Sequence, residues 1–461
     1  MDIVKLIASL NDQYDVTIIT SIDGYVLFYQ NDSFNIDVFN RFFLPIQRQA
    51  KESFYKLFPG TVKKIDEDRI YELLYTGMMI IYEEDSKQYF MLELICRDTR
   101  KTSDSLQEPE AITGPRDGFV ENIKTNVCLI RQRIKDNSLT IKELRLGRRS
   151  KTKINILSIS DVTNDCFLKQ VEYYLNTIDT DAILSLEDIT TVFQKNCIMP
   201  QYLYLGVPDI ASRRLLDGEI IILVDNVPSA ICLPNTISSF LRNRVEQINI
   251  PMYSLFERFF LYLSIFLAVF FLPIMTCFLT YQSDSLSLNM LLQIKLTEKG
   301  VFFPIYIEIF FVLFLFELYY IVSFKSPRLT LSSMVVLVGG IIIGQNTVES
   351  GMVSVFVMTS VALCFLATFT ISSNVTFVMS LSLLRVILLI STLFLGFFGF
   401  TISSFYLICH IAQESTFHVD FLFPFIPFSP KGVKKVLQFD SSRSLKERPL
   451  PLKTKTRRKK K

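Results

Sequence analysis

Short apolar runs alternate with polar residues through the first 250 residues, whereas long, nearly uninterrupted apolar runs fill residues 259–409. Strands alternating with helices are typical of a small α/β unit. We therefore predict a first α/β module over residues 1–105, whose elements are strands at 16–22 and 25–30 around Asp23-Gly24, a helix over 34–58, and two strands joined by a polar turn within 78–95.

A charged segment rich in proline and glycine follows at residues 97–118, and this composition is typical of a linker. The chain beyond it returns to alternating patterns, which predict a second α/β module over residues 106–250. Its predicted elements are an amphipathic helix over 120–134, a strand over 154–159, a helix over 165–178, and a hairpin over 219–233 that turns at Asp225-Asn226.

The apolar runs predict an α-helical multi-pass membrane domain over residues 251–411. Residues 259–281 carry no charge and are long enough to cross a hydrocarbon layer of about 30 Å. Arg258 just before them favours a cytoplasmic start, and Lys325 and Arg328 after a second span at 301–324 favour a cytoplasmic end. A glycine-containing region at 334–369 and a last span after Arg385 complete the predicted domain.

The number of crossings is open. The glycine-containing region is long enough for two, which gives a total of five. The basic C-terminal tail should lie on the same side as the N-terminal modules, and that requires an even number. We favour four crossings, with half of the glycine region re-entrant or interfacial, because glycines permit close helix packing and tight turns.

The basic residues are concentrated in the tail. Residues 431–461 hold thirteen Lys and Arg against Asp440 and Glu447, a net charge of +11, so the rest of the chain carries −8 of the total of +3. Next to membrane spans such a run favours anionic lipids at the cytoplasmic face over nucleic acid. We thus predict a Pro-rich interfacial segment and a short basic tail over 412–461.

Patterns for catalysis or cofactor binding are absent from the sequence. Both histidines, His410 and His418, follow the last span, and neither a phosphate-binding glycine motif nor a C-x-x-C pair occurs. We therefore expect no enzyme activity, no cofactor, no metal and no disulfide framework. The N-terminus is charged and lacks a signal-peptide pattern, so we expect the modules to stay in the cytoplasm.

Acidic and amide side chains inside the apolar region are the candidates for chemistry. A carboxylate that faces lipid costs on the order of 2–4 kcal/mol, so Glu308 and Glu317 should face protein or water. They are nine residues apart, which puts them on opposite sides of a helix, and each needs its own partner. They either line an ion path or make structural contacts between helices. The polar stretch Gln345, Asn346 and Glu349 is either part of that path or a loop in water.

Four segments, in the same order as in the family, resemble the GerA-type spore germination proteins, the A subunits of nutrient germinant receptors. They are EPEAITGPRDGFVENIKTNVCLIRQRIKD with the following LRLGRRSKTKINILSI, LLDGEIIILVDNVPSAICLP, IGQNTVESGMVS and FLFPFIPFSP, within roughly residues 75–430. The residues of the first segment that carry the resemblance are Glu108, Pro109, Gly114, Pro115, Arg116, Gly118, Phe119, Glu121, Asn126, Arg131 and Arg133.

The resemblance implies a two-part cytoplasmic N-terminal region and a membrane domain in the spore inner membrane. It implies partnership with a transporter-like B subunit and a lipoprotein C subunit of the same receptor. It also implies self-association into an oligomer that forms a ligand-gated ion path. The function expected from it is to couple nutrient sensing by the partners to ion release at the start of germination.

The chain departs from the family pattern at several charged positions. Leu313 stands where a third membrane acid is usual, Gly206-Val207 where Glu-Arg is usual, and Tyr320-Ile321 where Arg-Glu is usual. These losses are typical of a divergent, specialised or weakly active paralogue. They make a non-conducting receptor scaffold one alternative to an ion path. A secondary transporter, whose glycine-broken segment binds substrate near the middle of the membrane, is the other.

Overall fold

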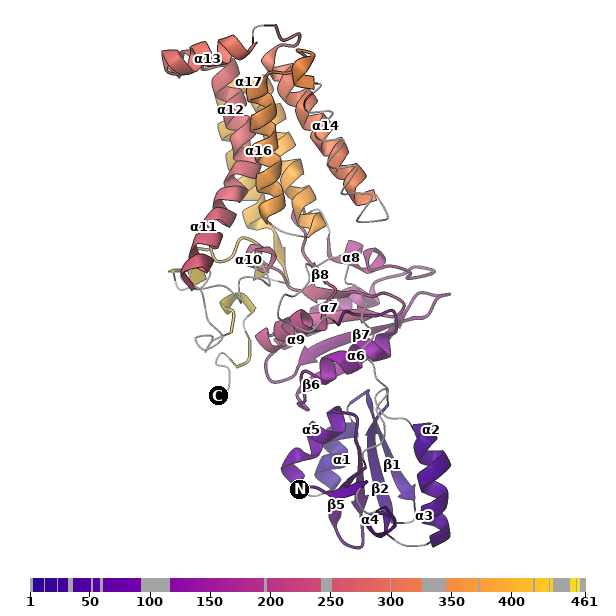
Figure 1. Ribbon diagram of the computed structural model, residues 1–461. Coiled ribbons are helices and arrows are strands. Elements are labelled where there is room, and N and C mark those ends of the chain that lie inside the picture. The colour runs from indigo at the N-terminus through magenta and orange to yellow at the C-terminus, as the bar shows by residue number, and fades with distance from the viewer. Residues whose placement is uncertain are drawn as a thin grey trace.

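The computed structural model stacks three parts along one axis, with the N-terminal module at one end, a second module in the middle and a helical bundle at the other end (Figure 1). It describes residues 3–92, 117–241, 251–325 and 345–456, apart from 12, 23, 32–35, 51–52, 59–60, 195–196, 299, 346, 372–373, 418, 431, 434–447 and 453. The predicted succession of an α/β region and a helical region is confirmed. Most of the linker predicted at 97–118 lies outside the described residues.

The first module is a five-stranded antiparallel sheet of order β1-β2-β4-β5-β3. Alternate residues of its strands enter two cores: Val26, Phe28 and Ile80 pack with α1 and α5, while Leu27 and Ile81 pack on the opposite face. Its elements are α1 (Ile3–Asn11), β1 (Val16–Ile22), β2 (Tyr25–Gln30), α2 (Ile36–Val38), η1 (Phe39–Phe43), α3 (Leu44–Ala50), α4 (Phe54–Leu57), β3 (Val62–Lys64), η2 (Glu67–Arg69), α5 (Ile70–Tyr75), β4 (Met79–Glu83) and β5 (Gln88–Leu92).

The second module repeats this topology, with antiparallel strands in the order β6-β7-β9-β10-β8. In both modules a helix precedes the first strand, and another helix precedes the fourth. The predicted hairpin over 219–233 is confirmed as β9 paired with β10. The elements are α6 (Ile123–Arg131), β6 (Leu139–Leu146), β7 (Thr152–Ile159), α7 (Asp165–Asn176), α8 (Glu187–Phe193), β8 (Leu203–Leu205), α9 (Pro208–Asp217), β9 (Ile220–Val224), β10 (Ala230–Leu233) and α10 (Ile237–Phe240).

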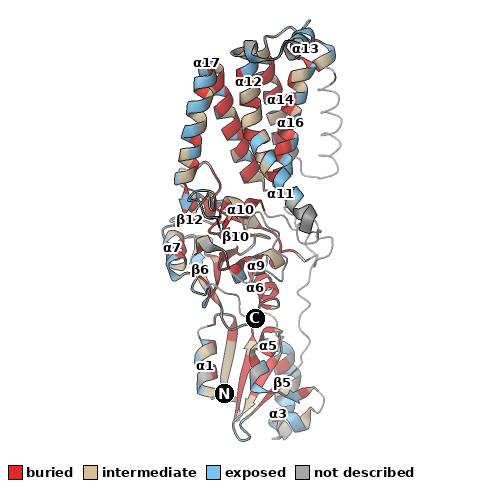
Figure 2. Ribbon diagram, turned by 90° about the vertical axis from the view of Figure 1, so that its left-hand side faces the viewer, coloured by how far each residue is buried: buried red, intermediate tan, exposed pale blue. Residues whose placement is uncertain are grey.

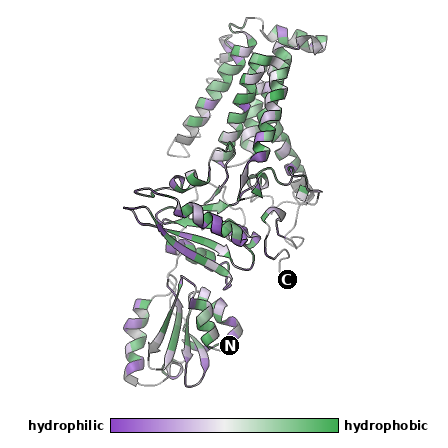
Figure 3. Cartoon of the chain, turned by 180° about the vertical axis from the view of Figure 1, so that it is seen from behind, coloured by the Kyte–Doolittle hydropathy of each residue, from purple (hydrophilic) through white to green (hydrophobic). Residues whose placement is uncertain are grey.

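The bundle contains two helical stretches that are long and apolar enough to cross a membrane, Phe256–Thr280 and Val375–Gln413. Its residues are largely hydrophobic, whereas hydrophobic and hydrophilic residues are mixed in the modules (Figure 3). The elements are α11 (Pro251–Phe266), η4 (Leu267–Phe271), α12 (Leu272–Thr280), η5 (Ser283–Ser285), α13 (Leu288–Glu298), α14 (Ile305–Lys325), α16 (Val355–Ile371) and α17 (Val375–Gln413), followed by β11 (Ser415–Thr416), β12 (Val419–Asp420) and η6 (Leu450–Leu452).

The single span predicted after Arg385 is wrong, because α17 begins at Val375 and doubles back. Gly396 has a positive φ of 61° and a ψ of −139°, a conformation that favours glycine and interrupts the helix. Ser391 Oγ donates to Ser403 Oγ at 2.7 Å, although twelve residues of straight helix would separate them by about 18 Å. Residues 375–395 and 397–413 therefore form two antiparallel arms.

The helix boundaries near prolines also differ from the predictions. The first span begins at Pro251 rather than at residue 259, so Arg258 lies inside α11, and the helix predicted over 34–58 is divided into four pieces. The π-helical turns η1 and η4 end two residues before Pro45 and Pro273, respectively. Proline lacks an N–H and its ring crowds the preceding turn, which accounts for the widened turn at both places.

The directions of the helices bear on the crossing count. We call the end of the bundle remote from the modules the far end. α14 and α16 both start there, and the two arms of α17 run out and back, so the described helices make five passes. Because the first pass starts and the last pass ends beside the second module, an even total needs one more. The residues between α14 and α16 that could supply it, 326–344, lie outside the described residues.

The chain after α17 returns to the second module. Phe417 and Val419 join one core of that module, and Phe421 joins the other. Lys455 N donates to Val162 O at 3.0 Å, so part of the basic tail is also bound there. The Pro-rich segment predicted to lie along the membrane surface thus begins with a core residue, while Phe428 farther along is exposed.

Candidate functional site

Buried charged side chains mark three places where parts of the chain meet: the junction of the two modules, the middle of the bundle, and the end of α17. Burial of a charge is costly unless it is paired, so such pairs are candidates for sites that hold or transmit a conformation. Figure 2 shows the buried residues running through both sheets and along the inner faces of the bundle helices.

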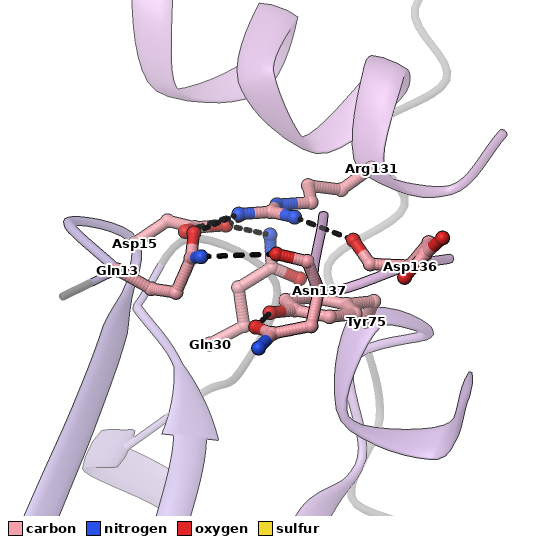
Figure 4. Close-up of polar contacts among 7 residues, drawn as sticks. All are labelled: Gln13, Asp15, Gln30, Tyr75, Arg131, Asp136 and Asn137. Atoms are coloured by element: carbon pink, nitrogen blue, oxygen red, sulfur yellow. Dashed lines mark hydrogen bonds and ion pairs between the residues drawn. The ribbon is translucent and has the colours of Figure 1, made fainter. Parts of the chain in front are cut away.

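Arg131, at the end of α6, forms the junction of the modules (Figure 4). Its Nε lies 2.7 Å from Asp15 Oδ2, and both side chains have no exposed surface. One Nη also donates to Gln13 Oε1 at 2.8 Å, and the guanidinium lies 4.2 Å from the centre of the Tyr75 ring. The loops that follow α1 and α6, which occupy equivalent places in the two modules, therefore face each other across one ion pair.

Other residues of the first segment of family resemblance hold the start of α6. The Asn126 side chain closes a loop by bonding the N–H and C=O of Val120, at 2.8 and 2.6 Å. Arg133 binds Asp117 at 2.6 Å and also pairs with Asp209 at the start of α9. Gly118 and Phe119 are buried, and the Glu121 carbonyl accepts the Asn226 N–H. The remaining candidates, Glu108, Pro109, Gly114, Pro115 and Arg116, lie outside the described residues.

Arg385 is the centre of the bundle. Its side chain is fully buried, and one Nη donates to Glu317 Oε1 of α14 at 2.6 Å. The same nitrogen donates to Ser382 Oγ at 3.0 Å, and the other Nη donates to Thr368 Oγ1 of α16 at 3.2 Å and to the Ala268 carbonyl of η4 at 3.4 Å. One guanidinium thus joins α17 to three other helical segments, and the widened turn at η4 presents a carbonyl to it.

Glu308 has a different role, at the far end. Its Oε2 accepts the Ser354 N–H at 3.0 Å and the Ser354 hydroxyl at 2.8 Å, just before α16 begins. A carboxylate at a helix N-terminus satisfies free N–H groups and complements the helix dipole. Glu308 and Glu317 therefore have separate partners within the protein, as expected from their spacing.

The polar stretch of the glycine-containing region is at the surface. Gln345 and Glu349 are both exposed, and Gln345 Nε2 donates to Glu349 Oε1 at 2.8 Å. Asn346 lies outside the described residues. Gln345 and Glu349 are not brought together with Glu317, because α14 carries Glu317 toward the middle of the bundle.

Glu414 joins the end of α17 to the second module. Its two carboxylate oxygens accept the backbone N–H groups of Ile198 and Met199 at 2.7 and 3.1 Å. His410, one helical turn earlier, lies 3.4 Å from the same carboxylate. Since the arm of α17 packs in the bundle, any movement of that arm would be transmitted to the loop that precedes β8.

We expect Glu414→Gln to reduce the pH dependence of stability. Burial raises the pKa of the Glu414 carboxyl, although hydrogen bonds from the Ile198 and Met199 backbone lower it in part. A raised native-state pKa means that the carboxyl stabilises the fold most below its ordinary pKa of 4.5 and loses this contribution as pH rises through the raised value. The Tm advantage of wild type over the variant should therefore shrink from pH 4 to pH 8. The exposed Glu84→Gln is the control, and equal pH profiles for the two variants would contradict the expectation.

Several of these residues were missed by sequence reasoning. The apolar pattern predicts Arg385 at the flank of a span, whereas it lies in the interior of α17, and the sequence pattern does not indicate Asp15 or Glu414. A single basic residue within a long apolar stretch is the signal that could have identified Arg385 as the partner of a membrane acid. Asp15 and Glu414 have partners more than 100 residues away, so no local pattern indicates them.

A fourth buried cluster lies under α9. Arg214 binds Glu219 at 3.0 Å, and the Cys232 thiol donates to the same carboxylate at 2.7 Å. Burial raises the pKa of both Glu219 and Cys232. All three side chains are enclosed, so the cluster holds α9 on β9 and β10 rather than facing a ligand. Across the described part of the chain, no three His, Cys, Asp or Glu side chains gather as a metal site.

The profile of the family described as "Bacillus/Clostridium GerA spore germination protein" matches residues 17–450. Spore germination protein XA of Bacillus anthracis is 31% identical over 78% of this chain and 73% of its own length. Stage V sporulation protein AF of Bacillus subtilis (strain 168) is 30% identical over 84% of this chain and 78% of its own.

Among solved structures, the N-terminal domain of the A subunit of the Bacillus megaterium spore germinant receptor GerK3 aligns with a TM-score of 0.38 and 18% identity, over 50% of this chain and 92% of that one. The profile match covers most of the chain, including both sheets and the helices that carry Glu317 and Arg385. The chain therefore belongs to the GerA family of spore germination proteins.

Proposed function

We propose that this protein is the A subunit of a nutrient germinant receptor in the spore inner membrane. It would act with a transporter-like B subunit, a lipoprotein C subunit and further copies of itself, and it would couple their nutrient sensing to ion release. Family membership supports this role, as do relatives whose names refer to spore germination or sporulation. The proposed role is conformational and includes no catalytic step.

A multi-pass membrane placement follows in the same proposal. The two long apolar stretches and the exposed apolar side chains of the bundle support it. With the modules in the cytoplasm, and with the first pass starting and the last pass ending beside the second module, the number of crossings would be even. The exposed apolar side chains of α14 and α17 would then face lipid or a neighbouring copy. They include Phe310, Phe314, Phe398 and Phe405.

The Glu317–Arg385 ion pair is the observation that carries the coupling proposal. It ties α14 to α17, and the second arm of α17 ends at the Glu414 contact with the second module. A ligand shifts a conformational equilibrium only by binding one state more tightly than the other. We infer that partner binding changes the relative energy of two arrangements of these helices, and that the ion pair stabilises one of them.

Glu317→Gln should reduce germinant-triggered ion release while leaving protein level and receptor assembly close to wild type. The amide keeps an acceptor for Arg385 but removes the counter-charge, so the balance between the two arrangements changes more than the packing. Potassium efflux from spores and immunoblots of receptor subunits measure the two effects. Glu84→Gln, at an exposed site of the first module and outside the candidate residues, is the control. Wild-type efflux at normal protein level would argue against the coupling role of the pair.

A non-conducting receptor scaffold is the second candidate, and one observation favours it. Both membrane carboxylates are engaged in helix contacts, and Leu313, at the position of the missing acid, is a buried core residue. The charged groups thus join the helices of the bundle to one another and do not line a path through it. Planar-bilayer recordings of the purified oligomer distinguish the two functions, since only the ion-path function predicts a conductance.

A further inference from the structure

Helix α13 presents an apolar stripe that no other part of the described chain covers. Leu288, Leu292 and Leu296 are 72%, 50% and 66% exposed. Their spacing of four residues places them along one side of the helix. Ile294 is buried, so the helix contacts the bundle through a different side. Three such leucines on an eleven-residue helix need an apolar environment.

The position of α13 points to the nature of that environment. The helix lies across the far end of the bundle and does not run along α12 and α14 (Figures 1 and 2). The 21 residues of α14 span about 31 Å, close to the hydrocarbon thickness of a bilayer, so α13 lies at the level of the far membrane boundary. Exposed aromatic residues also occur at this end, before and after α13 in the sequence, namely Tyr281, Phe302 and Tyr306. Aromatic side chains are enriched at this depth of a membrane.

We propose that α13 is an in-plane membrane helix whose leucine stripe inserts among the acyl chains of the far leaflet. This inference rests on the membrane placement proposed above. Lipid fits better than a protein partner because exposed apolar side chains also occur on the other helices of the bundle, including Phe310 and Phe314 of α14. The exposed Lys295 lies between two of the leucines, and its long apolar stem lets its charge reach the headgroups.

The absence of tryptophan from the sequence permits a direct test. Leu292→Trp, made in the full chain and reconstituted in vesicles, gives a single tryptophan on the stripe. Its fluorescence is compared in vesicles of unlabelled lipid and in vesicles of lipid brominated on the acyl chains, near the headgroup end or near the bilayer centre. Leu288→Trp is a second probe of the same stripe. Phe405→Trp on α17 and Tyr173→Trp on α7 are exposed controls for lipid and for water.

We expect the emission of Leu292→Trp to fall by about half with bromine near the headgroup end, and to fall less with bromine near the centre. Phe405→Trp should be quenched more by the deeper bromine, and Tyr173→Trp should not be quenched. Unquenched emission from both Leu292→Trp and Leu288→Trp, with Phe405→Trp quenched, would overturn the in-plane helix and leave the membrane placement intact. If Phe405→Trp also escaped quenching, the membrane placement itself would be wrong.

Discussion

Replacing Arg131 with methionine should destabilise the protein by about 3–5 kcal/mol, because it leaves the Asp15 carboxylate buried without its counter-ion. The side chains of Gln30 and Arg131 both donate hydrogen bonds to Asp15. Of these two donors, only the Gln30 amide, at 3.3 Å, remains in the variant. The loss should appear as a lower Tm of the full chain in detergent and as faster proteolysis between the two modules.

Arg145→Met is the matched control for Arg131→Met. Arg145 also lies in the second module and pairs with a carboxylate, Glu143, but its side chain is 63% exposed. Exposed ion pairs contribute about 1 kcal/mol or less. Adding Asp15→Leu to Arg131→Met removes the unpaired charge and should recover part of the loss. Equal Tm values for Arg131→Met and Arg145→Met would show that the junction does not depend on the buried pair.

Arg385→Met should have the largest effect in the bundle, because it removes the side chain that joins α17 to three other helical segments. Glu317 is then left as an unpaired acid among apolar helices, at a cost on the order of 2–4 kcal/mol. We expect a lower Tm in detergent, reduced protein in spores and loss of germinant-triggered potassium efflux.

A double-mutant cycle separates the ion pair from the other contacts of Arg385. Combining Arg385→Met with Glu317→Gln removes both charges, so the double variant should be more stable than the sum of the single losses by about 1–3 kcal/mol. Leu383→Met, a half-exposed position two residues away on the same helix, is the control for substitution in α17. Additive losses would mean that Glu317 and Arg385 are not energetically coupled.

Local patterns predicted most of the secondary structure, and the exceptions have identifiable causes. The β4–β5 and β9–β10 hairpins follow from apolar runs on both sides of a polar turn. The length of α17 was not predicted, because Arg385 resembles the charged end of a span when only its neighbours in sequence are considered. The reversal at Gly396 was missed as well, since a lone glycine in an apolar run also fits simple helix packing.

The spacing of Glu308 and Glu317 predicted that each would need its own partner, but it could not identify Ser354 or Arg385. Those partners lie 46 and 68 residues away, and helix packing alone brings them into reach. In the same way, Arg131 was recognised as part of a family segment, whereas its role depends on Asp15, 116 residues earlier.

The sequence by itself determined the division into an α/β region and an apolar helical region, the family, and the need to shield the carboxylates of the apolar region. These properties depend on composition, on periodicity and on the transfer cost of a charge, all of which are local. Only the tertiary structure decided that Arg131, Arg385 and Glu414 connect the parts of the molecule, and that α17 turns back on itself. Ion pairs and chain reversals depend on which distant segments pack together, and that is set by the burial of the whole chain.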